Sequence, residues 1–158
     1  MLAISTGYYN TLKFLHVLAA ITWVGSTIYV QALATKVKGE GDPTRLAATA
    51  KDIADLGTRL ILPASVAVLV FGVWLVAVSP WNFTDTWVLI GLAGIAVTIV
   101  TGAGFLGPES ARLSKLSGER DPADPEIQSR IKRIFAISRI DLVVLILVVA
   151  DMVFKPGS

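Results

Sequence analysis

Four apolar runs, each close to the roughly twenty residues that a membrane-spanning helix needs, dominate this chain and limit its possible folds. They cover residues 12–34, 60–79, 86–106 and 134–154. A helix rises 1.5 Å per residue, so each run can cross a hydrocarbon core about 30 Å thick. Hydrophobic residues fill 54% of the 158 positions, more than a soluble core of this size requires. The sequence therefore predicts an all-α integral membrane four-helix bundle, with residues 1–158 as one transmembrane domain.

The composition excludes several other classes of protein. The chain has no cysteine, which rules out disulfides, zinc–thiolate sites, iron–sulfur clusters and thiol nucleophiles. Its formal net charge is only +2, and its lysines and arginines gather in the segments between apolar runs. Such clusters are typical of topology signals that meet anionic lipid, so the lipid bilayer is the expected partner and nucleic acid is not.

The distribution of positive charge also predicts the orientation of the spans. Lysine and arginine are frequent in residues 35–59 and 107–133, whereas the short connection 80–85 has neither. Positively charged loops are retained on the cytoplasmic side of a membrane. We therefore expect a multi-pass protein of the bacterial cytoplasmic (inner) membrane, with both basic segments inside and both termini extracytoplasmic. The chain forms two hairpins of the same orientation.

Each basic segment contains a signal for the start of a helix. Asp42-Pro43 and Asp124-Pro125 both combine an N-cap residue with a proline in the first helical turn. Apolar residues follow each pair at helical spacing. The pattern predicts amphipathic helical extensions of spans two and four at the cytoplasmic interface.

Prolines also predict where two of the spans end. Proline has no backbone N–H and its ring clashes with the preceding turn of a helix. Ser79-Pro80 should end the second span, and Gly107-Pro108 should end the third.

The first span carries the main candidate for a cofactor site. His16, the only histidine, lies about one turn inside the span, and Ala20, Trp23 and Thr27 follow it at helical spacing. Small residues such as Gly25 would let a flat ligand approach closely. A neutral imidazole is a good ligand for haem iron or copper. The alternative is a structural histidine that is hydrogen-bonded to a neighbouring helix.

Two further ionisable residues should lie at the depth of His16. Lys13 precedes it by one turn, and Asp151 lies near the outer end of span four. The three side chains can form one polar cluster in which the Asp151 carboxylate orients the imidazole or pairs with the Lys13 ammonium. The alternative is that Lys13 and Asp151 reach the head-group region independently.

A second group of charges is expected towards the cytoplasmic face. Arg59 opens span two, while Arg139 and Asp141 lie in the first turns of span four. Residues two apart on a helix point in different directions, so Arg139 and Asp141 should not pair with each other. Arg59 is the nearest partner for Asp141 by depth, and this group is interpreted as a structural ion pair between helices.

The first span also resembles the opening helix of a superfamily of small bacterial membrane proteins. The likeness rests on residues 12–25, where Lys13-x-x-His16 is followed by Trp23-x-Gly25, and less specifically on Arg59-Leu60-Ile61-Leu62-Pro63. The superfamily includes CopD-like copper-resistance proteins, haem-binding oxygen-independent protoporphyrinogen oxidases and an uncharacterised group of predicted integral membrane proteins. The chain is most similar to the uncharacterised group.

This resemblance implies that His16 binds haem b as an iron ligand, with a redox or porphyrin-handling role. The related oxidases carry a His-x-x-Lys or similar polar motif on the third span, but residues 87–105 contain neither histidine nor lysine. The iron would then be five-coordinate, take a second ligand other than histidine, or lie between two His16 side chains of a homodimer.

Two other functions stay open at this point. Polar groups in the spans are few and no acid–base pair has a convincing spacing, which favours a non-enzymatic module such as an accessory subunit of a larger membrane complex. A small transporter or channel would need a polar path between the two groups of charges. The sequence identifies neither a substrate nor a redox partner, and it does not decide whether the protein is an enzyme.

Overall fold

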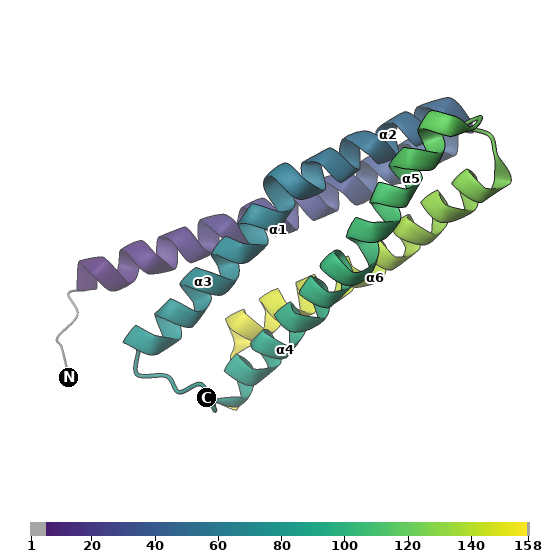
Figure 1. Ribbon diagram of the computed structural model, residues 1–158. Helices are drawn as coiled ribbons and strands as arrows, with labels where there is room; N and C mark the ends of the chain where they lie inside the picture. Colours follow the sequence, from purple (N-terminus) through teal and green to yellow (C-terminus); the bar gives the residue numbers. More distant parts are fainter. Residues whose placement is uncertain (1–5, 158) are drawn as a thin grey trace.

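The computed structural model describes residues 6–157, and this part of the chain is all-helical, as predicted. Its helices form four long rods that run side by side (Figure 1). The second and third rods each consist of two α-helices joined by a five-residue π-helix. In chain order the α-helices are α1 (Thr6–Glu40), α2 (Pro43–Leu56), α3 (Leu62–Val78), α4 (Thr86–Thr101), α5 (Gly107–Glu119) and α6 (Pro125–Phe154).

Three of these rods are long and apolar enough to cross a membrane. They are Thr6–Glu40, Pro43–Val78 and Thr86–Glu119. The fourth, Pro125–Phe154, is of similar length but carries three charged residues within its apolar stretch, at positions 139, 141 and 151. Each rod is also longer than the apolar run inside it, so the basic segments are mostly helical rather than extended loops.

The two predicted helix starts are confirmed. The side chain of Asp42 accepts hydrogen bonds from the backbone N–H groups of Thr44 (2.9 Å) and Arg45 (3.3 Å). Asp124 accepts one from the N–H of Glu126 (2.8 Å). These bonds satisfy N–H groups that have no partner within a helix. The predicted end of the second span is also confirmed, because α3 stops at Val78 and the next residue is extended.

The expected end of a helix at Gly107-Pro108 is wrong. The rod does not stop at Gly107-Pro108 but continues as α5 to Glu119. A π-helix, Gly102–Leu106, precedes the proline, and the N–H of Gly107 bonds to the carbonyl of Gly102, five residues back. A π-turn is wider than an α-turn and changes which carbonyl the proline ring meets. The proline is therefore accommodated in the first turn of a new α-helix.

The second rod also accommodates an interior proline after a π-helix. Its π-helix, Gly57–Ile61, immediately precedes α3, whose second residue is Pro63. The N–H of Leu62 bonds to the carbonyl of Gly57. Both interior prolines thus follow a five-residue π-helix that begins at a glycine.

The π-helices separate two halves of the molecule. The polar half contains α2, α5, the last turns of α1 and the first turns of α6, and its core includes Val37, Leu113, Ile127 and Ile131. The apolar half contains α3, α4 and the remainder of α1 and α6, with Trp23 at the centre of a smaller core. The first and last described residues both lie at the end of the apolar half (Figure 1).

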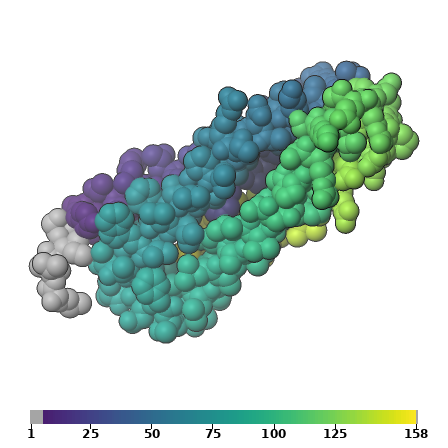
Figure 2. Space-filling model, in the orientation of Figure 1, coloured from purple at the N-terminus to yellow at the C-terminus, as the bar shows by residue number. Residues whose placement is uncertain are grey.

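Helices in the apolar half pack as two pairs. Helix α1 lies along α3, and α4 lies along α6, whereas α3 and α4 are joined by a loop but do not pack along each other. The surface between α3 and α4 is hollowed, and atoms of the purple and yellow ends of the chain are visible at its bottom (Figure 2). This hollow leads to a cavity lined by all four rods.

Candidate functional site

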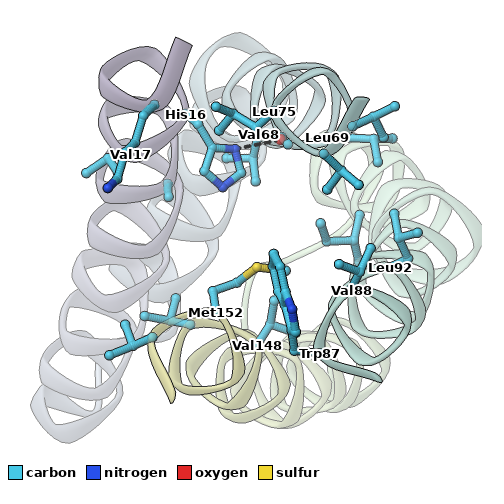
Figure 3. Close-up of a pocket in the computed structure, with 18 of the residues that line it drawn as sticks. His16, Val17, Val68, Leu69, Leu75, Trp87, Val88, Leu92, Val148 and Met152 are labelled. Atoms are coloured by element: carbon cyan, nitrogen blue, oxygen red, sulfur yellow. Dashed lines mark hydrogen bonds between the residues drawn. The ribbon is translucent and has the colours of Figure 1, made fainter. Parts of the chain in front are cut away.

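The cavity lies between the two helix pairs of the apolar half and has a volume of about 650 Å³. Aliphatic and aromatic side chains of α1, α3, α4 and α6 form most of its wall (Figure 3). Cavities of 300–1,000 Å³ with apolar walls and a few polar groups are typical ligand sites. The chemistry of the site therefore depends on which polar groups reach this wall.

His16 is one of the polar residues that α1 contributes to the cavity wall. Its Nδ1 lies 3.0 Å from the backbone carbonyl oxygen of Val68 on α3. A carbonyl only accepts hydrogen bonds, so Nδ1 carries the proton and donates it. The second ring nitrogen, Nε2, is then unprotonated and points into the cavity (Figure 3). This is the arrangement that proteins use to present imidazole to a metal, with one nitrogen held by a carbonyl and the other free to coordinate.

Gly72 makes this contact between α1 and α3 possible. A Cβ at this position would lie 3.0 Å from Cε1 and 3.4 Å from Nδ1 of His16. Because Gly72 lies one turn after Val68, the missing side chain opens the helix surface next to the accepting carbonyl. The His16 ring thus occupies space that is open because residue 72 of α3 is a glycine.

Three other residues predicted for the site also line this cavity. They are Lys13, Trp23 and Gly25 of α1. Lys13 lies towards the end of the cavity where the chain termini are, and Lys155 approaches the same end from α6. The Lys155 ammonium lies 4.4 Å from the ring centre of Trp81 and 5.0 Å from that of Trp87. The cavity therefore has an apolar body and two positive charges at one end.

Asp151 lies near the level of His16, as expected, but its side chain faces α4 and not His16. Its side chain is 7% exposed and is directed at α4, where its Oδ2 would lie 3.6 Å from a Cβ on Gly91. Within residues 6–157, neither carboxylate oxygen has a hydrogen-bond partner. The group that orients His16 is the Val68 carbonyl, so the predicted orienting role of Asp151 is wrong. The buried indole nitrogen of Trp87, one turn from Gly91, also has no hydrogen-bond partner among these residues.

The second predicted group of charges is not assembled. Arg59 is exposed and pairs with Asp55 at 3.9 Å, one turn earlier on the same rod. No ion pair joins Arg59 or the exposed Arg139 to Asp141 in the described part of the chain. One oxygen of Asp141 is buried without a hydrogen-bond partner there. The residues that connect α1 to α6 at this level are Gln31 and Ser138, whose side chains are hydrogen-bonded at 2.8 Å.

Sequence reasoning missed two residues that the structure brings into view. Gln31 continues the helical stripe that runs through His16, Trp23 and Thr27, so its position on the buried face could have been found from that spacing. Met152 lines the cavity from α6, on the wall opposite His16 (Figure 3). A lone methionine in an apolar run gives no signal of its own, because methionine is a common filler of cores.

The long apolar helices and their few buried polar groups define an integral membrane protein of the helical class. The family model described as "Predicted integral membrane protein (DUF2269)" matches residues 10–156, and the chain therefore belongs to this family. This finding confirms the expected likeness to the uncharacterised group of membrane proteins. No curated protein and no solved structure matches the chain.

Proposed function

We propose that this protein binds haem b in the cavity of the apolar half, with Nε2 of His16 as an axial ligand of the iron. The observation that carries the proposal is the hydrogen bond from Nδ1 of His16 to the Val68 carbonyl. It fixes the tautomer in which Nε2 has a free lone pair, and it holds the ring towards the cavity.

The remainder of the cavity fits a porphyrin. A porphyrin ring is flat and apolar, and the wall around His16 is formed by aliphatic and aromatic side chains. Its two carboxylates need a polar or positively charged end, and Lys13 and Lys155 line the same end of the cavity. The volume of about 650 Å³ is that of a site for a large cofactor rather than for a single ion.

Each of these residues would have a separate role. His16 would hold the iron, Val68 and Gly72 would orient the imidazole, and the two lysines would bind carboxylates. The apolar wall would exclude water from the ring. When bound, haem supplies one-electron redox chemistry, which supports the redox or porphyrin-handling role suggested by the likeness to the wider CopD-like superfamily.

We further propose that all four rods span the bacterial cytoplasmic membrane, with the polar half inside and both termini outside. The basic segments support this orientation. Since the chain has no cysteine, Asn82→Cys and Ser117→Cys can be labelled individually. A membrane-impermeant maleimide should label N82C in spheroplasts and S117C only after lysis. The reverse pattern would overturn the proposed orientation.

The haem proposal is tested by the absorption spectrum of the protein purified in detergent after expression with ample haem. We expect a Soret band that is lost in His16→Ala and restored in part by added imidazole, which can enter the space left by the side chain. Phe14→Ala is the matched control, because Phe14 lies on the same helix and is 63% exposed outside the cavity. A wild-type protein without a Soret band, or an unchanged band in H16A, would overturn the proposal.

A further inference from the structure

We propose that Met152 is the second axial ligand of the haem, so that the cofactor is held between α1 and α6. This inference rests on the proposed function and adds to it the identity of the ligand opposite His16. A thioether is a known partner of histidine in haem ligation.

The two side chains lie at the same level of the bundle. Gln31 of α1 and Ser138 of α6 are joined by a hydrogen bond of 2.8 Å, which fixes the register of the two antiparallel helices. His16 lies 15 residues before Gln31, and Met152 lies 14 residues after Ser138. At 1.5 Å per residue, these positions are about 22 Å and 21 Å from the hydrogen bond, in the same direction. His16 and Met152 are thus within about one residue of the same level.

At that level the two side chains extend from opposite walls of the cavity. Figure 3 shows the free nitrogen of His16 on one side, and the sulfur of Met152 next to Trp87 on the other. Both residues line the cavity. His16 and Met152 would therefore hold the iron from the two facing walls of the cavity.

The packing of α4 on α6 holds the thioether in place. The methyl group of Met152 occupies the position that a side chain on Gly91 would take, since a Cβ there would collide with it. One turn along each helix, Val148 fills the corresponding space at Gly94. Two glycines on α4 therefore receive two side chains of α6. The methyl end of Met152 is held against α4, and the residue also lines the cavity.

No other side chain of the cavity wall, within the described residues, is placed for this role. Tyr9 and Lys13 belong to the same helix as His16 and precede it, so they lie on its side of the cavity. Lys155 is held over the rings of Trp81 and Trp87. Asp151 does not line the cavity. The thioether of Met152 is also neutral, so its burial in an apolar wall has no cost of desolvating a charge.

A histidine and a methionine could in principle bind a copper ion instead, because both are suitable ligands for it. Residues 6–157 contain no group of three or more histidine, cysteine or carboxylate side chains that would add further ligands to such an ion. A single ion would also leave most of the 650 Å³ empty. Haem would use both the volume of the cavity and the two facing side chains, His16 and Met152.

The test compares ferric spectra and midpoint potentials of the haem-loaded wild type, Met152→Leu and Gly91→Ala. Leucine keeps the volume of methionine but has no sulfur, so M152L should retain its Soret band through His16. It should lose the methionine–iron charge-transfer band and have a lower midpoint potential, because methionine ligation raises the potential. G91A keeps the sulfur but displaces the methyl group, so it should weaken the same band. Val143→Leu, on the exposed face of α6, is the control and should match the wild type.

Each outcome of this comparison has a separate meaning. If M152L keeps both the charge-transfer band and the wild-type potential, Met152 is not a ligand, while the proposed role of His16 stands. If the wild type binds no haem at all, both proposals are overturned. If M152L cannot be purified, G91A decides: an unchanged band in that variant overturns the role of Met152, and a weakened band supports it.

Discussion

The polar half and the apolar half are built from the same four rods, but their interiors differ. In the polar half, Ile127, Ile131 and Val37 are at most 1% exposed, and the core is continuous across α1, α2, α5 and α6. In the apolar half, the buried core around Trp23 is smaller, and a cavity separates the two helix pairs. The polar half has a continuous buried core and a smaller pocket of about 240 Å³ between α2 and α5, whereas the apolar half has a smaller core and the cavity of about 650 Å³.

The polar contacts of the two halves differ in a corresponding way. In the polar half, Glu109 of α5 bonds to Arg130 of α6 at 2.8 Å and to Arg112 at 3.1 Å. In the apolar half, the buried carboxylate of Asp151 has no hydrogen-bond partner among residues 6–157. The two halves therefore differ both in how closely their interiors are packed and in how their buried polar groups are satisfied.

The largest expected effect is the loss of packing in the polar half. Ile131→Ala should lower the free energy of unfolding by about 2–5 kcal/mol, because the site is closely packed and cannot collapse. Leu92→Ala removes a side chain that already borders the cavity and should cost about 1 kcal/mol or less, since fewer contacts are lost. Denaturant unfolding in detergent measures both. Equal losses would mean that the two halves are packed alike.

An intermediate effect is expected where α4 meets α6. A Cβ at position 94 would collide with a methyl group of Val148, so Gly94→Ala should destabilise the apolar half by about 1–3 kcal/mol. At Gly25 of α1, nothing lies within 4 Å of an added Cβ. Gly25→Ala should therefore be neutral or should stabilise the helix by up to about 1 kcal/mol. Thermal unfolding distinguishes the two, and a neutral G94A would show that the two helices are further apart than described.

The smallest effect is expected at Glu109, and it depends on pH. The hydrogen bond from Arg130 is the main reason why the pKa of Glu109 lies below its ordinary value of 4.5. The carboxylate therefore stabilises the fold above that pH, and the contribution is lost as the pH falls through the lower pKa of the folded state. Arg130 retains Glu126, at 2.9 Å, as a second partner, which limits the loss in Glu109→Gln.

Melting temperatures measured across a pH series test this prediction. The wild type should melt above E109Q at neutral pH, and the difference should shrink once the pH is below 4.5. Glu119→Gln, on the exposed end of α5, is the control and should follow the wild type throughout. A difference between the wild type and E109Q that grew towards low pH would contradict the role of Arg130.

Much of the fold could be predicted from the sequence, because it depends on local patterns. The apolar runs gave the four rods, and Asp42 and Asp124 marked two helix starts through side chains that bond to their own first turn. The helix end expected at Gly107-Pro108 was wrong, because the π-helix Gly102–Leu106 precedes Pro108 and places it in the first turn of α5. In both rods the π-helix begins at a glycine six residues before the proline, and this spacing was the available signal.

The candidate site could be predicted only in part. His16 was identifiable because a single histidine in an apolar span is rare. Its partner was not identifiable, since Val68 contributes a backbone carbonyl, which every residue has. The expected pairing of Arg59 with Asp141 relied on depth alone, and depth does not determine which face of a helix a side chain occupies. Asp55, one turn from Arg59, was the closer choice.

The two π-helices also affect how the halves of a rod are related. A π-turn contains one more residue than an α-turn, so the side chains beyond it are rotated by roughly 100° around the rod. In the rod Pro43–Val78, α2 packs into the core of the polar half and α3 lines the cavity. Because the π-helix lies between them, the direction in which the buried face of α2 points does not fix the direction of the cavity face of α3. Removal of one residue from Gly57–Ile61 would leave a straight helix, but it would turn either Val68 and Gly72 away from His16 or Leu46 and Ala50 away from their core.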